Sequence, residues 1–183
     1  MDNKCSICGG ILTQFGSRNI KDGIVCRYCA KKASPWLNDD DYLKRDAEAF
    51  KKHLEYREKN KEKIAKFVPE KEVKGKYTLY LDEDNGEFVI SKRRDYKRDN
   101  ADVLLYKDII SLTIFEELDE TGKNYNLLMD IKLRNKEIDN VCFRVNEFPG
   151  LQKESKEYKE ALDKAYEYLN GFESVNGIDF VEV

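Results

Sequence analysis

The sequence predicts an α+β protein in which a small cysteine-rich module precedes a larger, strand-rich domain. Three observations support this fold class. Two Cys-x-x-Cys pairs lie within the first 29 of 183 residues. From residue 74 to residue 145, apolar and polar side chains alternate with the period of β-strands. Residues 152–170 then show the period of an amphipathic helix. This length suits one ordinary domain plus a small appendage.

The first pair is formed by Cys5 and Cys8 and the second by Cys26 and Cys29, with 17 residues between the pairs. Each turn brings two sulfurs close enough to share one tetrahedral ion, so two such turns fill a zinc site. Disulfides or free thiols are the alternative. A module this short buries little apolar surface, and metal binding would stabilise it. We therefore predict one structural Zn²⁺ per chain, with no coordination position left for a substrate.

The residues between the pairs predict a hairpin that returns the chain to the metal. Residues 11–15 have strand character, residues 16–19 predict a turn, and Asp22 with Gly23 predicts a tight bend. The pattern CxxCGG at residues 5–10, with KDGIVC at residues 21–26 and AKK at residues 30–32, resembles small N-terminal zinc-ribbon domains of bacterial and phage proteins. The resemblance covers residues 1–35. It implies a zinc ribbon, often fused to a pleckstrin-homology-like domain, and it implies no activity.

Residues 36–70 predict a linker helix. Asn38 and the three aspartates after it form a helix start. An apolar stripe follows at Leu43, Ala47, Phe50 and Leu54. Beyond this stripe the segment is rich in charge, and we expect a solvated spacer there. His53, the only histidine, is expected to be exposed, because the metal already has four thiolates.

Residues 71–173 predict the larger domain. Expected strands cover residues 77–81, 87–90, 103–106, 109–115, 125–133 and 138–145. Six or seven short strands before one helix are the layout of pleckstrin-homology-like domains, and residues 105–112 (LYKDIISL) resemble the third-strand region of bacterial members. The resemblance implies a bent antiparallel sheet, or partly open barrel, capped by the C-terminal helix. Residues 174–183 form a β-type tail that is expected to add to a sheet edge.

Charge and composition limit the function classes. The net charge is −3, yet residues 1–34 carry six Lys/Arg against two Asp/Glu, so the basic end is the ribbon. No apolar run is long enough for a transmembrane helix. The first residues do not resemble a secretory signal, so we expect a cytoplasmic protein. Acidic residues in the first hairpin, at 82–87, argue against membrane binding.

Catalytic patterns are missing from the sequence, and we expect no enzymatic activity. It contains no glycine-rich phosphate loop and no histidine–glutamate metal motif. Cys142 alternates with Val141 and Phe143, and we expect a small packed residue rather than a nucleophile. The basic loop that begins with Lys92 and ends with Arg98 is expected to be a solvated loop, with phosphate binding as its alternative.

The favoured function is therefore a non-enzymatic adaptor that binds a protein partner through the ribbon, the larger domain or both. The alternative is a nucleic-acid-binding protein that uses the basic ribbon. Phe15 and Tyr28 would then supply stacking surfaces. The phosphate-binding residues would be Arg18, Lys21, Arg27, Lys31 and Lys32.

Overall fold

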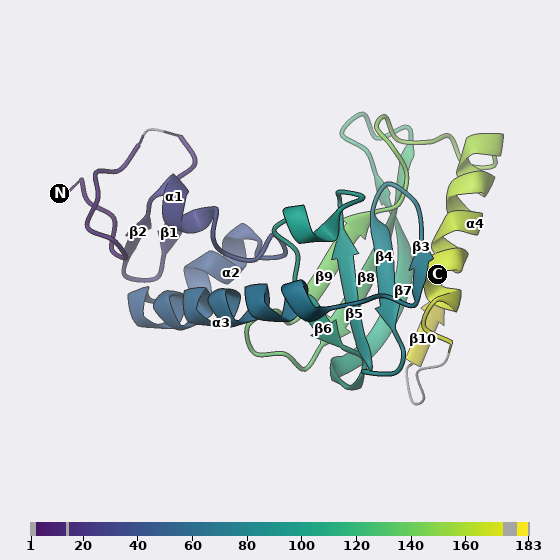
Figure 1. Cartoon of the computed structure of the whole chain (residues 1–183). Helices are drawn as coiled ribbons and strands as arrows, with labels where there is room; N and C mark the ends of the chain where they lie inside the picture. The colour runs from purple at the N-terminus through teal and green to yellow at the C-terminus, as the bar shows by residue number, and fades with distance from the viewer. Residues whose placement is uncertain (1–2, 14, 174–178, 183) are drawn as a thin grey trace. The chain divides into compact units, whose positions relative to one another are not determined.

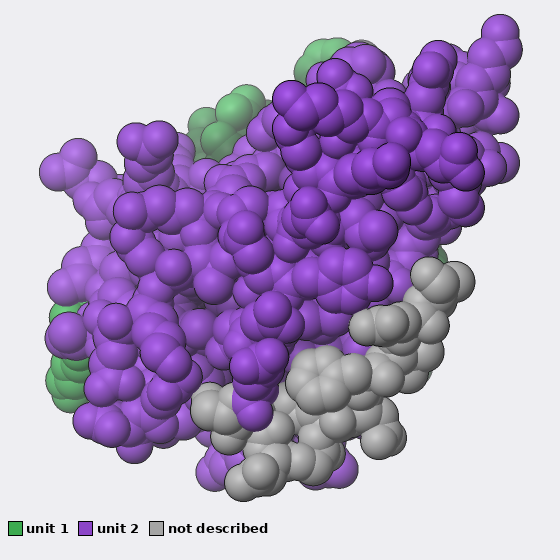
Figure 2. Space-filling view, turned by 90° about the vertical axis from the view of Figure 1, so that its right-hand side faces the viewer, with its two compact units in different colours: residues 1–66 green, residues 67–183 purple. Residues whose placement is uncertain are grey.

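The computed structural model of the chain describes residues 3–13, 15–173 and 179–182, the last four by their backbone. The chain divides into two compact units, residues 1–66 and residues 67–183 (Figure 2). Its secondary structure is mixed α+β, with mainly antiparallel sheets (Figure 1). The predicted α+β class is therefore confirmed, and each unit is described separately below.

A two-stranded hairpin and three helices build unit 1. Strands β1 (Arg18–Ile20) and β2 (Gly23–Val25) pair in antiparallel register. They are followed by α1 (Arg27–Ala30), α2 (Asp39–Lys44) and α3 (Ala47–Lys66). The strand predicted at residues 11–15 is not found in the described residues of that segment, 11–13 and 15, where Ile11 forms an isolated bridge with Lys4. The buried residues Ile20 and Val25 place the hairpin later, whereas Ile11 and Phe15 are each 77% exposed.

The predicted helix start at Asn38 is confirmed. Its side chain accepts a hydrogen bond from the backbone N–H of Asp41, and the Asp41 carboxylate accepts one from the Asn38 N–H, both at 3.0 Å. This reciprocal capping box satisfies two N–H groups that a helix leaves unpaired. The single predicted helix is in fact two, because the chain becomes extended at Arg45.

The β1–β2 turn holds this break between α2 and α3. The backbone N–H of Lys21 donates to the carbonyl of Arg45 at 2.8 Å. The carboxylate of Asp22 accepts from the N–H of Ala47, also at 2.8 Å, at the first residue of α3. Two consecutive residues of the hairpin turn therefore fix the end of one helix and the beginning of the next.

The expectation of an exposed His53 is wrong, and the charged segment 55–66, although mostly exposed as expected, also has three buried residues on α3. His53 is fully buried, and its Nε2 accepts the backbone N–H of Ser34 at 3.1 Å. Arg57 and Asn60 are also buried on α3, and the Arg57 guanidinium donates to the carbonyl of Lys32. The helix therefore belongs to the same compact unit as the cysteines.

Two four-stranded sheets and one long helix build unit 2. The first sheet has the order β3-β4-β5-β6 and is antiparallel throughout. The second has the order β10-β7-β8-β9, with β10 parallel to β7. The strands are β3 (Lys71–Val73), β4 (Thr78–Asp82), β5 (Glu87–Ser91), β6 (Val103–Leu105), β7 (Ile109–Leu118), β8 (Tyr125–Leu133), β9 (Asn140–Arg144) and β10 (Asp179–Glu182).

Helix α4 (Lys156–Asn170) lies beside the strands of unit 2 (Figure 1), and side chains in it and just after it contact both sheets. The buried ring of Tyr168 meets Phe143 of β9 edge-on, with ring centroids 5.4 Å apart. Phe172 meets Phe88 of β5 in the same way at 5.1 Å. Edge-to-face geometry is a preferred arrangement for aromatic pairs. Tyr168 of the helix and Phe172 just after it thus pack on apolar side chains of different sheets.

The six strands predicted between residues 77 and 145 are all found in unit 2, with ends shifted by a few residues. The structure adds β3, a short polar strand that the alternation did not reveal. The two sheets are separate and do not form a closed barrel. The predicted tail strand is present at residues 179–182 on the edge of β7, while residues 174–178 and 183 lie outside the described part of the chain.

We expect a chain that begins at Phe67 to fold without residues 1–66, because unit 2 has its own core. A chain that begins at Lys71 lacks the buried Phe67, whose ring meets Tyr96 edge-on at 5.4 Å. The shorter chain should therefore be less stable by about 3 kcal/mol, the cost of removing a buried phenylalanine side chain. Circular dichroism recorded during thermal unfolding measures the folding and the stability of both chains. A disordered spectrum for the longer chain would contradict the division into two units.

Candidate metal centre and the basic surface beside it

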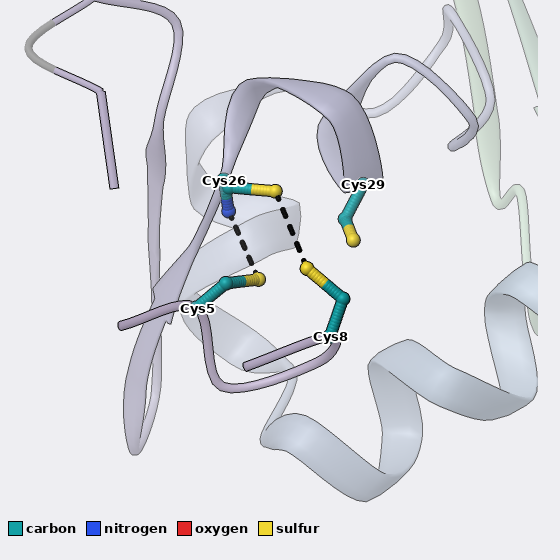
Figure 3. A group of neighbouring side chains, drawn as sticks. All are labelled: Cys5, Cys8, Cys26 and Cys29. Carbon is teal, nitrogen blue, oxygen red and sulfur yellow. Dashed lines mark hydrogen bonds between the residues drawn. The ribbon is translucent and has the colours of Figure 1, made fainter. Parts of the chain in front are cut away.

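The four cysteines predicted to bind a metal lie together. Their Sγ atoms are all within 4.8 Å of one another, with Cys8 and Cys26 at 3.7 Å (Figure 3). A tetrahedral zinc site with Zn–S distances of about 2.3 Å has sulfur–sulfur edges of about 3.8 Å. The cluster therefore fits a metal ion. All the cysteines are free, so the disulfide alternative is not seen in this structure.

Two turns position the sulfurs. In the first, the N–H of Gly9 donates to the carbonyl of Cys5, and Gly9 has a positive φ of 69° that favours glycine. In the second, Cys26 precedes α1 and Cys29 lies within that helix. The hairpin β1–β2 spans the sequence between the turns, so its register sets how the second pair meets the first.

Backbone donors prepare Cys5 for metal binding. Its sulfur accepts the N–H of Cys26 at 3.2 Å and that of Ile7 at 3.4 Å. Burial disfavours the charged thiolate, but backbone hydrogen bonds from Cys26, Cys8 and Ile7 outweigh it and lower the pKa of Cys5 to about 6. Thiolates, rather than thiols, are the metal ligands.

Cys29 shows the opposite effect. Burial raises the pKa of its thiol, and the neighbouring sulfurs of Cys8, Cys26 and Cys5 raise it further. Neighbouring thiolates repel one another, and this repulsion opposes ionisation of Cys29. A cation bound among the sulfurs would offset the repulsion. Three of the four cysteines are buried and all four positions are protein sulfurs. A metal ion held by these four sulfurs would have no open coordination position, as in structural sites.

A basic pocket lies in the same unit. It has a volume of about 390 Å³ and contains three of the five basic residues predicted for nucleic-acid contact, Arg18, Arg27 and Lys31, together with Phe15. Lys21 and Lys32 do not line it. Tyr28 is exposed, and the Arg27 guanidinium lies over its ring at 5.6 Å from the centroid.

The basic loop at residues 92–98 is ordered by its own contacts. Arg98 pairs with Asp95 at 3.0 Å, and the Asp99 carboxylate accepts the Ser91 hydroxyl at 2.7 Å and the Lys92 N–H at 3.0 Å. Burial disfavours the charged form of Asp99, but the hydrogen bonds to its carboxylate outweigh this effect and lower the pKa of Asp99. The carboxylate therefore braces the loop.

The expectation that Cys142 is a packed residue is wrong. Its thiol is exposed on β9, whereas the flanking Val141 and Phe143 are buried. The alternation had indicated opposite faces correctly, but the face that carries Cys142 is not covered.

A family described as a domain of unknown function (DUF4428) matches residues 4–53. The match contains the four cysteines, α2 and the first part of α3. No curated protein and no solved structure matches the chain. Among the described helices, none has the length and apolar character needed to cross a membrane.

We expect purified protein to carry one divalent metal ion per chain, measured by elemental analysis. Cys5→Ser and Cys26→Ser should each abolish stoichiometric binding and unfold unit 1, since a structural zinc contributes about 10 kcal/mol or more of folding free energy. Cys142→Ser is the matched control and should retain the ion. Metal-free wild-type protein with an intact unit 1 would contradict the assignment.

Proposed function

We propose that this protein is a zinc-stabilised adaptor that binds a protein partner and catalyses no reaction. The observation that carries the proposal is the convergence of four thiols within 4.8 Å, which leaves no coordination position for water or substrate. A closed zinc site stabilises a small unit whose surface then serves recognition. The ion would be Zn²⁺, because four thiolates are a ligand set of structural zinc sites.

Unit 2 would be a second interaction module of the pleckstrin-homology-like type. Two observations support this. Strands β3 to β6 form one antiparallel sheet in chain order, and β7 to β9 form another before α4. Such a module offers strand edges to which a partner can add a strand. The adaptor would act in the cytoplasm, whose reducing conditions keep zinc-binding thiols free.

The adaptor proposal is tested by affinity purification with the full zinc-loaded chain, quantified by mass spectrometry. We expect a partner protein at a fixed ratio to the chain, and we expect it to remain after nuclease treatment. The Cys5→Ser chain reports whether binding depends on the metal-stabilised unit, and the Cys142→Ser chain is the control. Absence of any saturable protein partner would overturn the proposal.

A nucleic-acid-binding function is the second candidate, and the pocket containing Phe15, Arg18, Arg27 and Lys31 favours it. Single-stranded nucleic acids bind basic grooves in which aromatic rings stack on the bases. On this hypothesis, reversing charge at Lys31 and Lys32 should weaken DNA or RNA binding and flatten its salt dependence. Fluorescence anisotropy across a salt series measures this. Sub-micromolar binding that the double change abolishes would favour this candidate over the adaptor.

A further inference from the structure

The basic pocket of unit 1 is built from three segments of chain. Phe15 and Arg18 come from the loop before β1 and from β1 itself, whereas Arg27 and Lys31 come from α1 and its C-terminal end. Gly16 allows the loop to approach, because a Cβ there would lie 3.1 Å from the Arg27 Cβ, and its φ is +79°. Among the described residues that line the pocket, none is acidic.

The floor of the pocket is fixed before any ligand arrives. The buried Tyr42 of α2 lines it, and its hydroxyl donates to the carbonyl of Ala30 at 3.3 Å. Its ring packs against Phe50 of α3 at 5.5 Å between centroids. Because Tyr42 belongs to the core cluster that also contains the metal-binding cysteines, the pocket is preorganised by that core.

A second hollow of about 300 Å³ adjoins the first through Arg18, which lines both. Its other walls include Asp39 and Leu43 of α2. Arg18 pairs with Asp39 at 3.4 Å, and Asp39 remains largely exposed. Leu43, the first residue of the apolar stripe, is 51% exposed. The surface therefore changes from cationic to acidic and apolar across Arg18.

We propose that the two hollows form one binding site for an extended peptide segment of a protein partner, with acidic side chains at one end and apolar and basic ones at the other. The acidic end would lie against Arg27 and Lys31, and the apolar and basic end against Leu43 and Asp39. This inference rests on the proposed adaptor function, and it names the chemistry of the partner.

Charge complementarity favours a peptide over a nucleic acid at this site. A nucleic-acid strand repeats one negative charge along its whole length. Such a strand would gain from Arg27 and Lys31 but would then meet Asp39 and the neighbouring exposed Asp40. A peptide can change the sign of its charge within a few residues. Carboxylates also form strong, charge-assisted hydrogen bonds with arginine.

The site is tested on the full, zinc-loaded, ¹⁵N-labelled chain by following amide shifts during titration. The probes are a short peptide with glutamates, a central leucine and then lysines, its reversed sequence, an all-glutamate peptide with the same leucine, and single-stranded oligothymidine. We expect one of the two mixed peptides to bind most tightly, with shifts at Gly16, Arg18, Lys31 and Leu43. Millimolar affinity suffices for detection by this method.

Substitutions then separate the two ends of the site. Arg27→Gln with Lys31→Gln should weaken the mixed peptide by about tenfold, the effect of losing charge-assisted hydrogen bonds. Asp39→Asn should weaken binding of the mixed peptide. It should strengthen binding of the all-glutamate peptide and of the oligonucleotide, because the variant no longer places a negative charge against them. Lys51→Gln, an exposed change on α3 outside both hollows, is the matched control and should change nothing.

Several outcomes would overturn the inference. They are failure of both mixed peptides to bind, binding that the Arg27 and Lys31 changes leave intact, and tightest binding by the oligonucleotide.

Retained metal and an unchanged amide spectrum show that each variant is folded, and Lys31→Gln alone replaces the double change if Arg27→Gln disturbs the adjacent Cys26. Capture of a protein partner by the pocket variant would refute this site but leave the adaptor function standing. Loss of all partner capture by wild-type protein would refute the adaptor function itself.

Discussion

Unit 1 depends on bringing four sulfurs to one point. Cys5, Cys26 and Cys29 belong to the same buried cluster as Ile20, Val25, Tyr42 and Phe50, so the thiols are part of the core rather than an attachment to it. A unit of 66 residues buries too little apolar surface to be robustly stable by hydrophobic burial alone. A cation that neutralises crowded thiolates would supply the missing free energy and, through the same contacts, fix the hairpin and α1.

The two units are stabilised by different kinds of interaction. Unit 2 relies on aromatic side chains: Tyr168 and Phe172, in and after α4, contact Phe143 in one sheet and Phe88 in the other. Large rings that meet edge-on bury much area and restrict orientation. A long helix can thus connect two open sheets without the sheets closing into a barrel.

Local patterns allowed much of this structure to be predicted. The cysteine spacing located the candidate metal site because each turn needs only four consecutive residues, and alternation located β4 to β9 because apolar side chains repeat on one face.

Residues whose interaction partners are distant in the sequence gave no such signal. His53 is buried because it accepts the N–H of Ser34, 19 residues away, and nothing in a charged helix indicates that bond. The break between α2 and α3 depends on the hairpin turn at Lys21 and Asp22, which is equally remote. The basic pocket forms because the loop before β1 approaches α1. Gly16 permits this approach, but a glycine in the sequence does not by itself predict it.

The parallel strand β10 has a consequence for the behaviour of the protein in concentrated solution. Strand β7 is the longest of the described strands, and its exposed side chains include Ile110 and Leu118. An uncovered strand of this kind offers unpaired backbone groups to other chains and is a starting point for aggregation. By pairing with residues 111–114, β10 occupies part of that edge with backbone from the same molecule. Strand β10 therefore leaves less of the β7 edge available for pairing with another copy of the chain.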